Sequence, residues 1–172
     1  MDEQIINRLK HIYELEKFQI AFYMSQLSST EDKYYHKAFE KIVETEKKHA
    51  VFFAHKLAKA DIPIPKVGGT LAEFAGSIVG ESLELTGQAN TCKMGVSLEK
   101  KSLLAYHNLI DELRGEPEVR SKLMEFLLEE EFHTLWLQDY VKRLKQNECQ
   151  NYGLASDSIE DHPTININMH WL

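Results

Sequence analysis

Six acidic and imidazole side chains interrupt the apolar faces of the helices that this sequence predicts. Residues three, four or seven apart share one face of a helix, and each of the six falls between apolar residues of its face. They are Glu16, Glu46, His49, Glu99, Glu130 and His133. Burying an unpartnered carboxylate costs several kcal/mol, so four of them need compensating positive charge. Two divalent cations would supply that charge, and the imidazoles would add neutral nitrogen ligands. The pattern therefore predicts a dinuclear metal site.

The two halves of the chain repeat one spacing of these residue types. Tyr23 lies seven residues after Glu16, and Tyr106 lies seven residues after Glu99. A Glu-x-x-His motif begins 30 residues after Glu16 and 31 residues after Glu99. The repeat predicts two helical hairpins that face each other about a pseudo-two-fold axis, with the metal pair between them. Tyr23 and Tyr106 are candidate catalytic residues that bond ligand carboxylates, and the alternative is that they only pack in the core.

Four long helices must position these residues. Helical spacing of apolar residues predicts them over residues 2–27, 31–60, 91–113 and 118–146. Proline cannot continue a helix, so Pro63 ends the second helix and Pro117 separates the last two. The connection over 67–92 is long and contains a shorter amphipathic helix over 70–85. The predicted fold class is all-α, a four-helix bundle with a long crossover between its second and third long helices.

Residues 1–148 are expected to form this one domain, and 149–172 a polar C-terminal tail. On the first helix the predicted apolar stripe includes Met24. Several further acids fall off the stripes and are interpreted as solvated, namely Glu14, Glu44, Glu129 and Glu131. For Glu129 the alternative is that it orients a metal ligand by a hydrogen bond, without contacting the metal itself.

Composition excludes several other classes of protein. The 172 residues include 20 Lys and Arg against 27 Asp and Glu, a formal charge of −7, which argues against a nucleic-acid partner. Two cysteines are too few for a disulfide scaffold or a four-cysteine metal site. No apolar run approaches the roughly 18–20 residues that span a bilayer. The N-terminus lacks a signal-peptide pattern, so we expect a cytoplasmic protein without a membrane partner.

At these residues the chain resembles the ferritin-like di-iron carboxylate superfamily, especially its rubrerythrin-like members. The Glu-then-Tyr spacing and the motifs Glu46-Lys-Lys-His49 and Glu130-Glu-Phe-His133 carry the resemblance, which covers residues 1–146. It implies a ferritin-like bundle with two iron ions, or manganese or a mixed pair instead, bridged by Glu46 and Glu130. Rubrerythrins have another glutamate at the position of Val96 and a four-cysteine rubredoxin-like domain, and this chain has neither. The symmetric donor set is also similar to that of demethoxyubiquinone hydroxylase.

The resemblance implies an oxidoreductase that reduces peroxide or O₂ at the metal pair. The electrons would come from a separate donor protein, and the chain would assemble as a homodimer. Ferritin-type iron oxidation and storage, hydroxylation of an organic substrate and a metal-free structural bundle are the alternatives. For the first ion we expect the ligands Glu16, Glu130 and His133, and for the second Glu46, His49 and Glu99.

Overall fold

All regular structure in the described part of the chain is helical. A computed structural model describes residues 2–27, 33–66, 87–113 and 115–151. Its helices are α1 (Glu3–Leu27), α2 (Lys33–Lys59), α4 (Gln88–Glu112) and α5 (Pro117–Asn151). The all-α prediction is therefore confirmed. The short helix expected over 70–85 and most of the expected tail, 152–172, lie outside the described residues.

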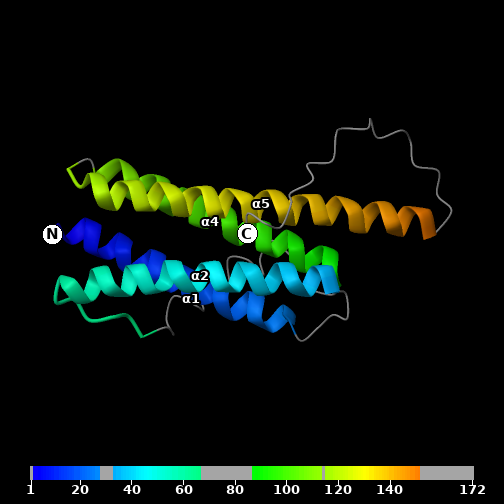
Figure 1. The fold of residues 1–172 in the computed structure, drawn as a ribbon, viewed down its shortest axis with the longest axis horizontal. Coiled ribbons are helices and arrows are strands. Elements are labelled where there is room, and N and C mark those ends of the chain that lie inside the picture. Colours follow the sequence, from blue (N-terminus) through cyan, green and yellow to red (C-terminus); the bar gives the residue numbers. More distant parts are fainter. Residues whose placement is uncertain (1, 28–32, 67–86, 114, 152–172) are drawn as a thin grey trace.

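The four helices form a bundle of two antiparallel hairpins (Figure 1). α1 packs along α2, α4 packs along α5, and contacts of α1 with α4 and of α2 with α5 join the two hairpins. α2 and α4 run in the same direction, so α2 ends and α4 begins at opposite ends of the bundle (Figure 1). This arrangement places the middle of all four helices around one common interior.

Local sequence explains where α2 ends and where α5 begins. Asp61 adopts a left-handed φ of 57°, and the amides of Asp61 and Ile62 donate to the carbonyls of Ala58 and Leu57, each at 3.0 Å. This is a Schellman motif, with the expected apolar contact because Ile62 packs on the cluster that contains Leu57. Pro117 opens α5, where its missing amide hydrogen would have no helical partner anyway.

Predicted helix bounds differ from the observed ones by a few residues. α4 begins at Gln88 rather than near residue 91, and α5 continues to Asn151 rather than ending near 146. Met24 is a clearer error, because its side chain is 49% exposed instead of lying in the core. Leu15 and Phe22 are buried in its place, since the covered side of α1 is rotated away from Met24.

Two apolar clusters fill the bundle on either side of its middle. One gathers aromatic side chains from α1, α2 and α5, including Tyr35, Phe39 and Trp136. The other lies toward the opposite end and includes Phe53, Leu109 and Phe126. Both clusters exclude water from the segment between them, which is where the six predicted polar residues lie.

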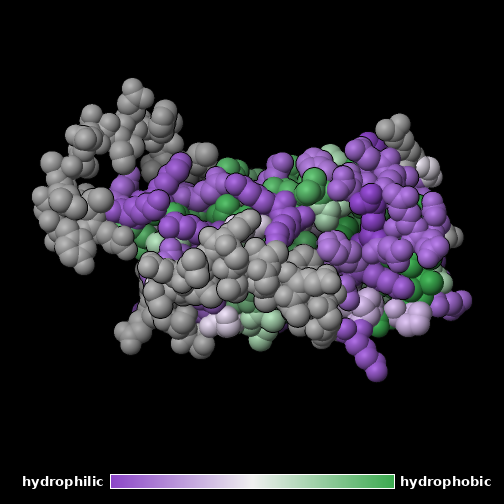
Figure 2. Space-filling model, turned by 180° about the vertical axis from the view of Figure 1, so that it is seen from behind, coloured by the Kyte–Doolittle hydropathy of each residue, from purple (hydrophilic) through white to green (hydrophobic). Residues whose placement is uncertain are grey.

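The outer surface carries mostly polar side chains with apolar ones between them. Figure 2 shows hydrophilic residues over much of the described surface on the face opposite to Figure 1. None of the described helices combines the length and the apolar character that a membrane span requires.

Candidate metal centre

The six predicted ligands meet in the interior of the bundle. α1 and α4 each supply one glutamate, and α2 and α5 each supply a glutamate and a histidine one helical turn apart. All six side chains are buried: Glu16, Glu46, His49, Glu99, Glu130 and His133. Their ligand atoms fall into two groups of four, each with all atoms within 4.8 Å of one another.

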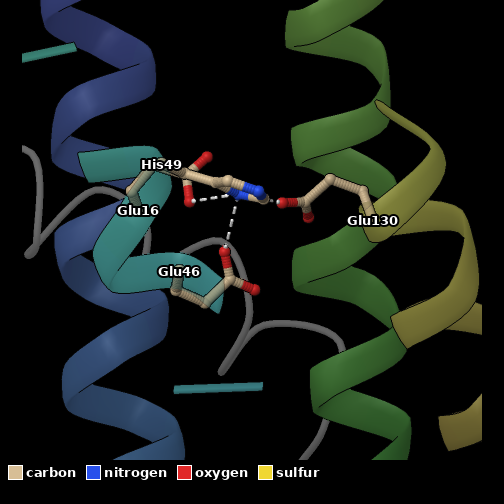
Figure 3. Close-up of side chains that lie close together, drawn as sticks. All are labelled: Glu16, Glu46, His49 and Glu130. Atoms are coloured by element: carbon tan, nitrogen blue, oxygen red, sulfur yellow. Dashed lines mark ion pairs between the residues drawn. The ribbon is translucent and has the colours of Figure 1, made fainter. Parts of the chain in front are cut away.

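The first group surrounds the Nδ1 atom of His49 (Figure 3). This nitrogen lies 3.5 Å from Glu16 Oε2, 3.3 Å from Glu46 Oε2 and 3.0 Å from Glu130 Oε1. Two donor atoms that each lie about 2.1 Å from a cation at right angles are about 3.0 Å apart. The spacing around His49 is therefore that of atoms able to share one ion.

The second group surrounds the Nδ1 atom of His133. It lies 3.1 Å from Glu46 Oε1 and 3.6 Å from Glu99 Oε2, and Glu130 completes the group. Glu46 thus turns one oxygen toward each imidazole. Glu46 and Glu130 belong to both groups, whereas Glu99 belongs only to the second. A carboxylate with one oxygen on each side is the geometry of a bridging ligand.

The grouping corrects one expectation from the sequence. We expected Glu16 with His133 and Glu99 with His49, but Glu16 lies beside His49 and Glu99 beside His133. Helix periodicity gives the face of each helix on which a residue lies. It does not give the direction in which a long carboxylate side chain then turns, and packing between the helices decides that.

Most atoms that face the centre of the cluster contact only one another and have no hydrogen-bond partner outside the cluster among the described residues. They comprise both oxygens of Glu46, one oxygen each of Glu16, Glu99 and Glu130, and Nδ1 of both histidines. Leaving a buried polar atom unpaired costs about 1–3 kcal/mol, and more for a charged group. Seven such atoms aimed at one interior region fit a pair of cations bound there.

Two tyrosines bond the terminal glutamates, which are Glu16 and Glu99, the two that each belong to only one ligand group. Tyr106 of α4 donates its hydroxyl to Glu16 Oε1 of α1 at 2.8 Å. Tyr23 of α1 makes the reciprocal hydrogen bond to Glu99 of α4. Each tyrosine therefore bonds one carboxylate oxygen and leaves the other facing the centre. This agrees with the prediction that both tyrosines bond candidate ligand carboxylates.

Gly95 gives Tyr23 the room to make its contact. An alanine Cβ at this position would lie 3.0 Å from Leu137 Cδ1 and 3.3 Å from the Tyr23 hydroxyl oxygen. A larger residue would displace the tyrosine from the α4 backbone, whose Gly95 carbonyl lies 3.5 Å from that hydroxyl.

Glu129 contacts a predicted ligand directly, which corrects its interpretation as a solvated residue. Its Oε2 lies 2.7 Å from His49 Nε2, the ring nitrogen that faces away from the cluster. Although partial burial opposes ionisation, the hydrogen bond with His49 lowers the pKa of the Glu129 carboxyl. When the ring is neutral and this carboxylate accepts the Nε2 hydrogen, the Nδ1 lone pair is directed at the cluster.

Two further buried polar residues border the cluster, and the sequence analysis missed both. The Ser102 hydroxyl donates to Gln19 Oε1 at 2.8 Å, and Gln19 Nε2 lies 3.5 Å from Glu130 Oε2. The serine therefore turns the amide so that its donor faces a carboxylate. The available signal was their shared position, three residues after Glu16 and Glu99 in the repeated pattern.

The carboxyl groups differ in how readily they ionise. Burial raises the pKa of Glu16 to about 8, and the nearby Glu46 carboxylate adds to the rise. Burial and the same neighbour raise the pKa of Glu130 well above its usual range. Burial also disfavours the charged form of Glu46, but hydrogen bonds with His133 and His49 outweigh it and lower the pKa.

Both imidazoles favour their protonated form in the absence of a cation. Burial opposes this in each ring. Hydrogen bonds with Glu46 and Glu99 nevertheless raise the pKa of His133 to about 10. For His49, hydrogen bonds led by the one with Glu129 raise the pKa well above its ordinary value. Protons therefore balance the negative charge of the metal-free cluster.

No protein-family model matches this sequence, and a search of curated proteins finds no match either. The chemistry of the cluster is therefore inferred from its own donor atoms and contacts. Four carboxylates and two imidazole nitrogens form a mixed oxygen and nitrogen donor set, which suits divalent iron, manganese or zinc.

Proposed function

We propose that this protein is a dinuclear metal oxidoreductase that reduces peroxide or O₂. The ions would be held by Glu16 and His49 on one side and by Glu99 and His133 on the other, with bridging carboxylates between them. Two iron ions would supply the two electrons of the reaction. A separate donor protein would then restore them.

The position of Glu46 carries the proposal. Its two oxygens lie 3.3 Å from His49 Nδ1 and 3.1 Å from His133 Nδ1, and neither has a hydrogen-bond partner outside the cluster among the described residues. A single metal ion would use only one side of this carboxylate. Two ions account for both oxygens and for both imidazoles.

Charge supports the same stoichiometry. Four carboxylates offer four negative charges, which two dications neutralise within a buried site. Without metal, the seven buried atoms that face the centre have no hydrogen-bond partner outside the cluster among the described residues, and protons must balance its charge instead. The six side chains are buried between two apolar clusters, and low exposure to water strengthens electrostatic interactions within the site.

Metal analysis after purification without chelators tests the dinuclear part. The proposal expects two iron or manganese ions per chain. Glu46→Gln removes one negative charge from the shared ligand and should lose both ions. Glu44→Gln is the matched control, because Glu44 is exposed on the same helix and pairs with Lys41 instead. A folded wild-type protein that takes up no metal would contradict the proposal.

Rapid mixing of the reduced, iron-loaded protein with peroxide and with O₂ tests the redox part. Oxidation should follow the visible absorption of ferric iron and should consume one two-electron oxidant for each iron pair. Loss of metal binding and loss of oxidation are separate readouts. A protein that binds two ions but reacts with neither oxidant would have a non-redox role, and a growing mineral particle would indicate storage.

A further inference from the structure

We propose that the two metal positions are unequal, and that Glu129 makes the position beside Glu16 and His49 the tighter one. The inference rests on the proposed dinuclear site and adds an order in which it fills. It assigns Glu129 as a positioning residue that acts through His49 and does not touch the ion.

The asymmetry originates at one pair of equivalent positions. Glu129 directly precedes Glu130 of the α5 motif, and Thr45 directly precedes Glu46 of the α2 motif. The six candidate ligands and the two tyrosines are repeated in both halves, but at this position an acid in one half corresponds to an alcohol in the other.

The acid is in contact with its histidine. Glu129 extends from α5 to α2, where its Oε2 lies 2.7 Å from His49 Nε2. A carboxylate that accepts the outer ring hydrogen of a ligating histidine fixes its tautomer and raises its basicity as a ligand. The Glu129 side chain is 41% exposed, so the desolvation cost of this extra charge is moderate.

The equivalent threonine is engaged elsewhere. Thr45 is buried, and its hydroxyl donates to the Lys41 carbonyl of its own helix at 3.2 Å. Both carboxylate contacts of His133 within the described residues are made by Nδ1, to Glu46 and Glu99. Among the residues that the structure describes, His133 therefore has no counterpart of the anionic partner on Nε2 of His49.

The tyrosine contacts of the ligands are matched between the halves, and Gln19, which lies 3.5 Å from Glu130 Oε2, is neutral. Each terminal glutamate receives one tyrosine hydroxyl, from Tyr106 to Glu16 and from Tyr23 to Glu99. Each ion would have one histidine and one terminal glutamate, and both would share Glu46 and Glu130. Among the described residues, Glu129 is thus the charged group outside the six ligands that contacts one of them at hydrogen-bond distance, and it favours a cation beside His49.

Titration of Co²⁺ into the metal-free protein tests the order of filling. Calorimetry gives the affinities, and the visible absorption of Co²⁺ reports its coordination. Wild-type protein should bind two ions in two steps of different affinity. His49→Ala should remove the tighter step, and His133→Ala should leave it intact.

Glu129→Gln isolates the positioning role, since the amide keeps the shape and loses the charge. The tighter step should weaken by about 10- to 100-fold while the weaker step stays unchanged. Glu131→Gln is the control, because this exposed neighbour has a similar charge and lies off the His49 contact. Thermal unfolding of each metal-free variant verifies that it is folded.

Three results would overturn the inference: two equal steps in wild-type protein, survival of the tighter step in His49→Ala, or equal weakening of both steps in Glu129→Gln. Failure of folded wild-type protein to bind any Co²⁺ would instead overturn the dinuclear site itself, and the inference with it. The two failures are therefore distinguishable.

Discussion

The hydroxyl of Tyr106 on α4 donates to Glu16 Oε1 on α1 at 2.8 Å, which links the two hairpins at the level of the cluster. The bond fixes the rotation of a carboxylate whose other oxygen faces His49. Tyr106 therefore has a role beyond filling the core, although it also packs against Phe53.

Replacing Tyr106 by Phe should keep the packing and remove this bond. Glu16 would then carry a second unpaired buried oxygen, at a cost of about 1–3 kcal/mol. We expect lower stability in chemical unfolding and weaker metal binding at the Glu16 side. Tyr23→Phe should weaken the Glu99 side instead. If the Tyr106→Phe protein binds metal with unchanged affinity, the Tyr106 hydroxyl has no role in metal binding and the residue acts only through its packing.

Glu46 and Glu130 should respond differently to the loss of charge, although both lie in both ligand groups. Glu46 is the ionised partner of two protonated imidazoles, so Glu46→Gln should destabilise the metal-free protein by about 3–5 kcal/mol. Glu130 favours its protonated form, so Glu130→Gln should change stability by about 1 kcal/mol or less.

Both variants should lose metal, because each removes a shared ligand. Chemical unfolding of the metal-free proteins at neutral pH separates them. Equal destabilisation by the two substitutions would show that the charges of the cluster are distributed in another way.

The metal-free protein should lose stability as the pH rises. The pKa of Glu16 increases from 4.5 to about 8 on folding, and that of His133 from 6.5 to about 10. Between the unfolded and folded pKa of each group, the folded protein holds a proton that the unfolded chain has released. The free energy of unfolding therefore falls with increasing pH. Melting temperatures measured from about pH 6 to about pH 9 should decrease. An increase over this range would contradict the prediction.

Binding of cations should release those protons. Glu16, Glu130, His49 and His133 all favour protonation without a metal, so loading two dications should free about four protons near neutral pH. Calorimetric titrations in buffers of different ionisation enthalpy count them. Metal affinity should rise with pH, and release of no protons would exclude the protonated cluster.

Gly95 should tolerate no side chain without cost. Gly95→Ala gains up to about 1 kcal/mol of helix propensity but crowds Leu137 and the Tyr23 hydroxyl, and overpacking typically costs about 1–3 kcal/mol. We expect net destabilisation and weaker metal binding on the Glu99 side. Gly115→Ala is the control, since a Cβ there meets nothing within 4 Å. Equal stability of the two variants would show that the tyrosine adjusts freely.

The sequence alone predicted the four long helices and the set of candidate ligands. Polar residues at apolar positions of a helix are costly, so six acids and imidazoles repeated on four amphipathic faces predict that they meet in the interior. α5 shows the limit of such patterns, because Leu128 and Leu135 are apolar yet exposed while Thr134 is buried.

Only the tertiary structure decided which of these groups lie beside each other. Periodicity describes each helix about its own axis, whereas the partner of a side chain depends on how neighbouring helices are rotated and aligned. For that reason Glu16 lies beside His49 and not His133, and Glu129 reaches a ring on another helix. Gln19 and Ser102 share a position in the repeat, but only the structure shows that they bond each other beside Glu130.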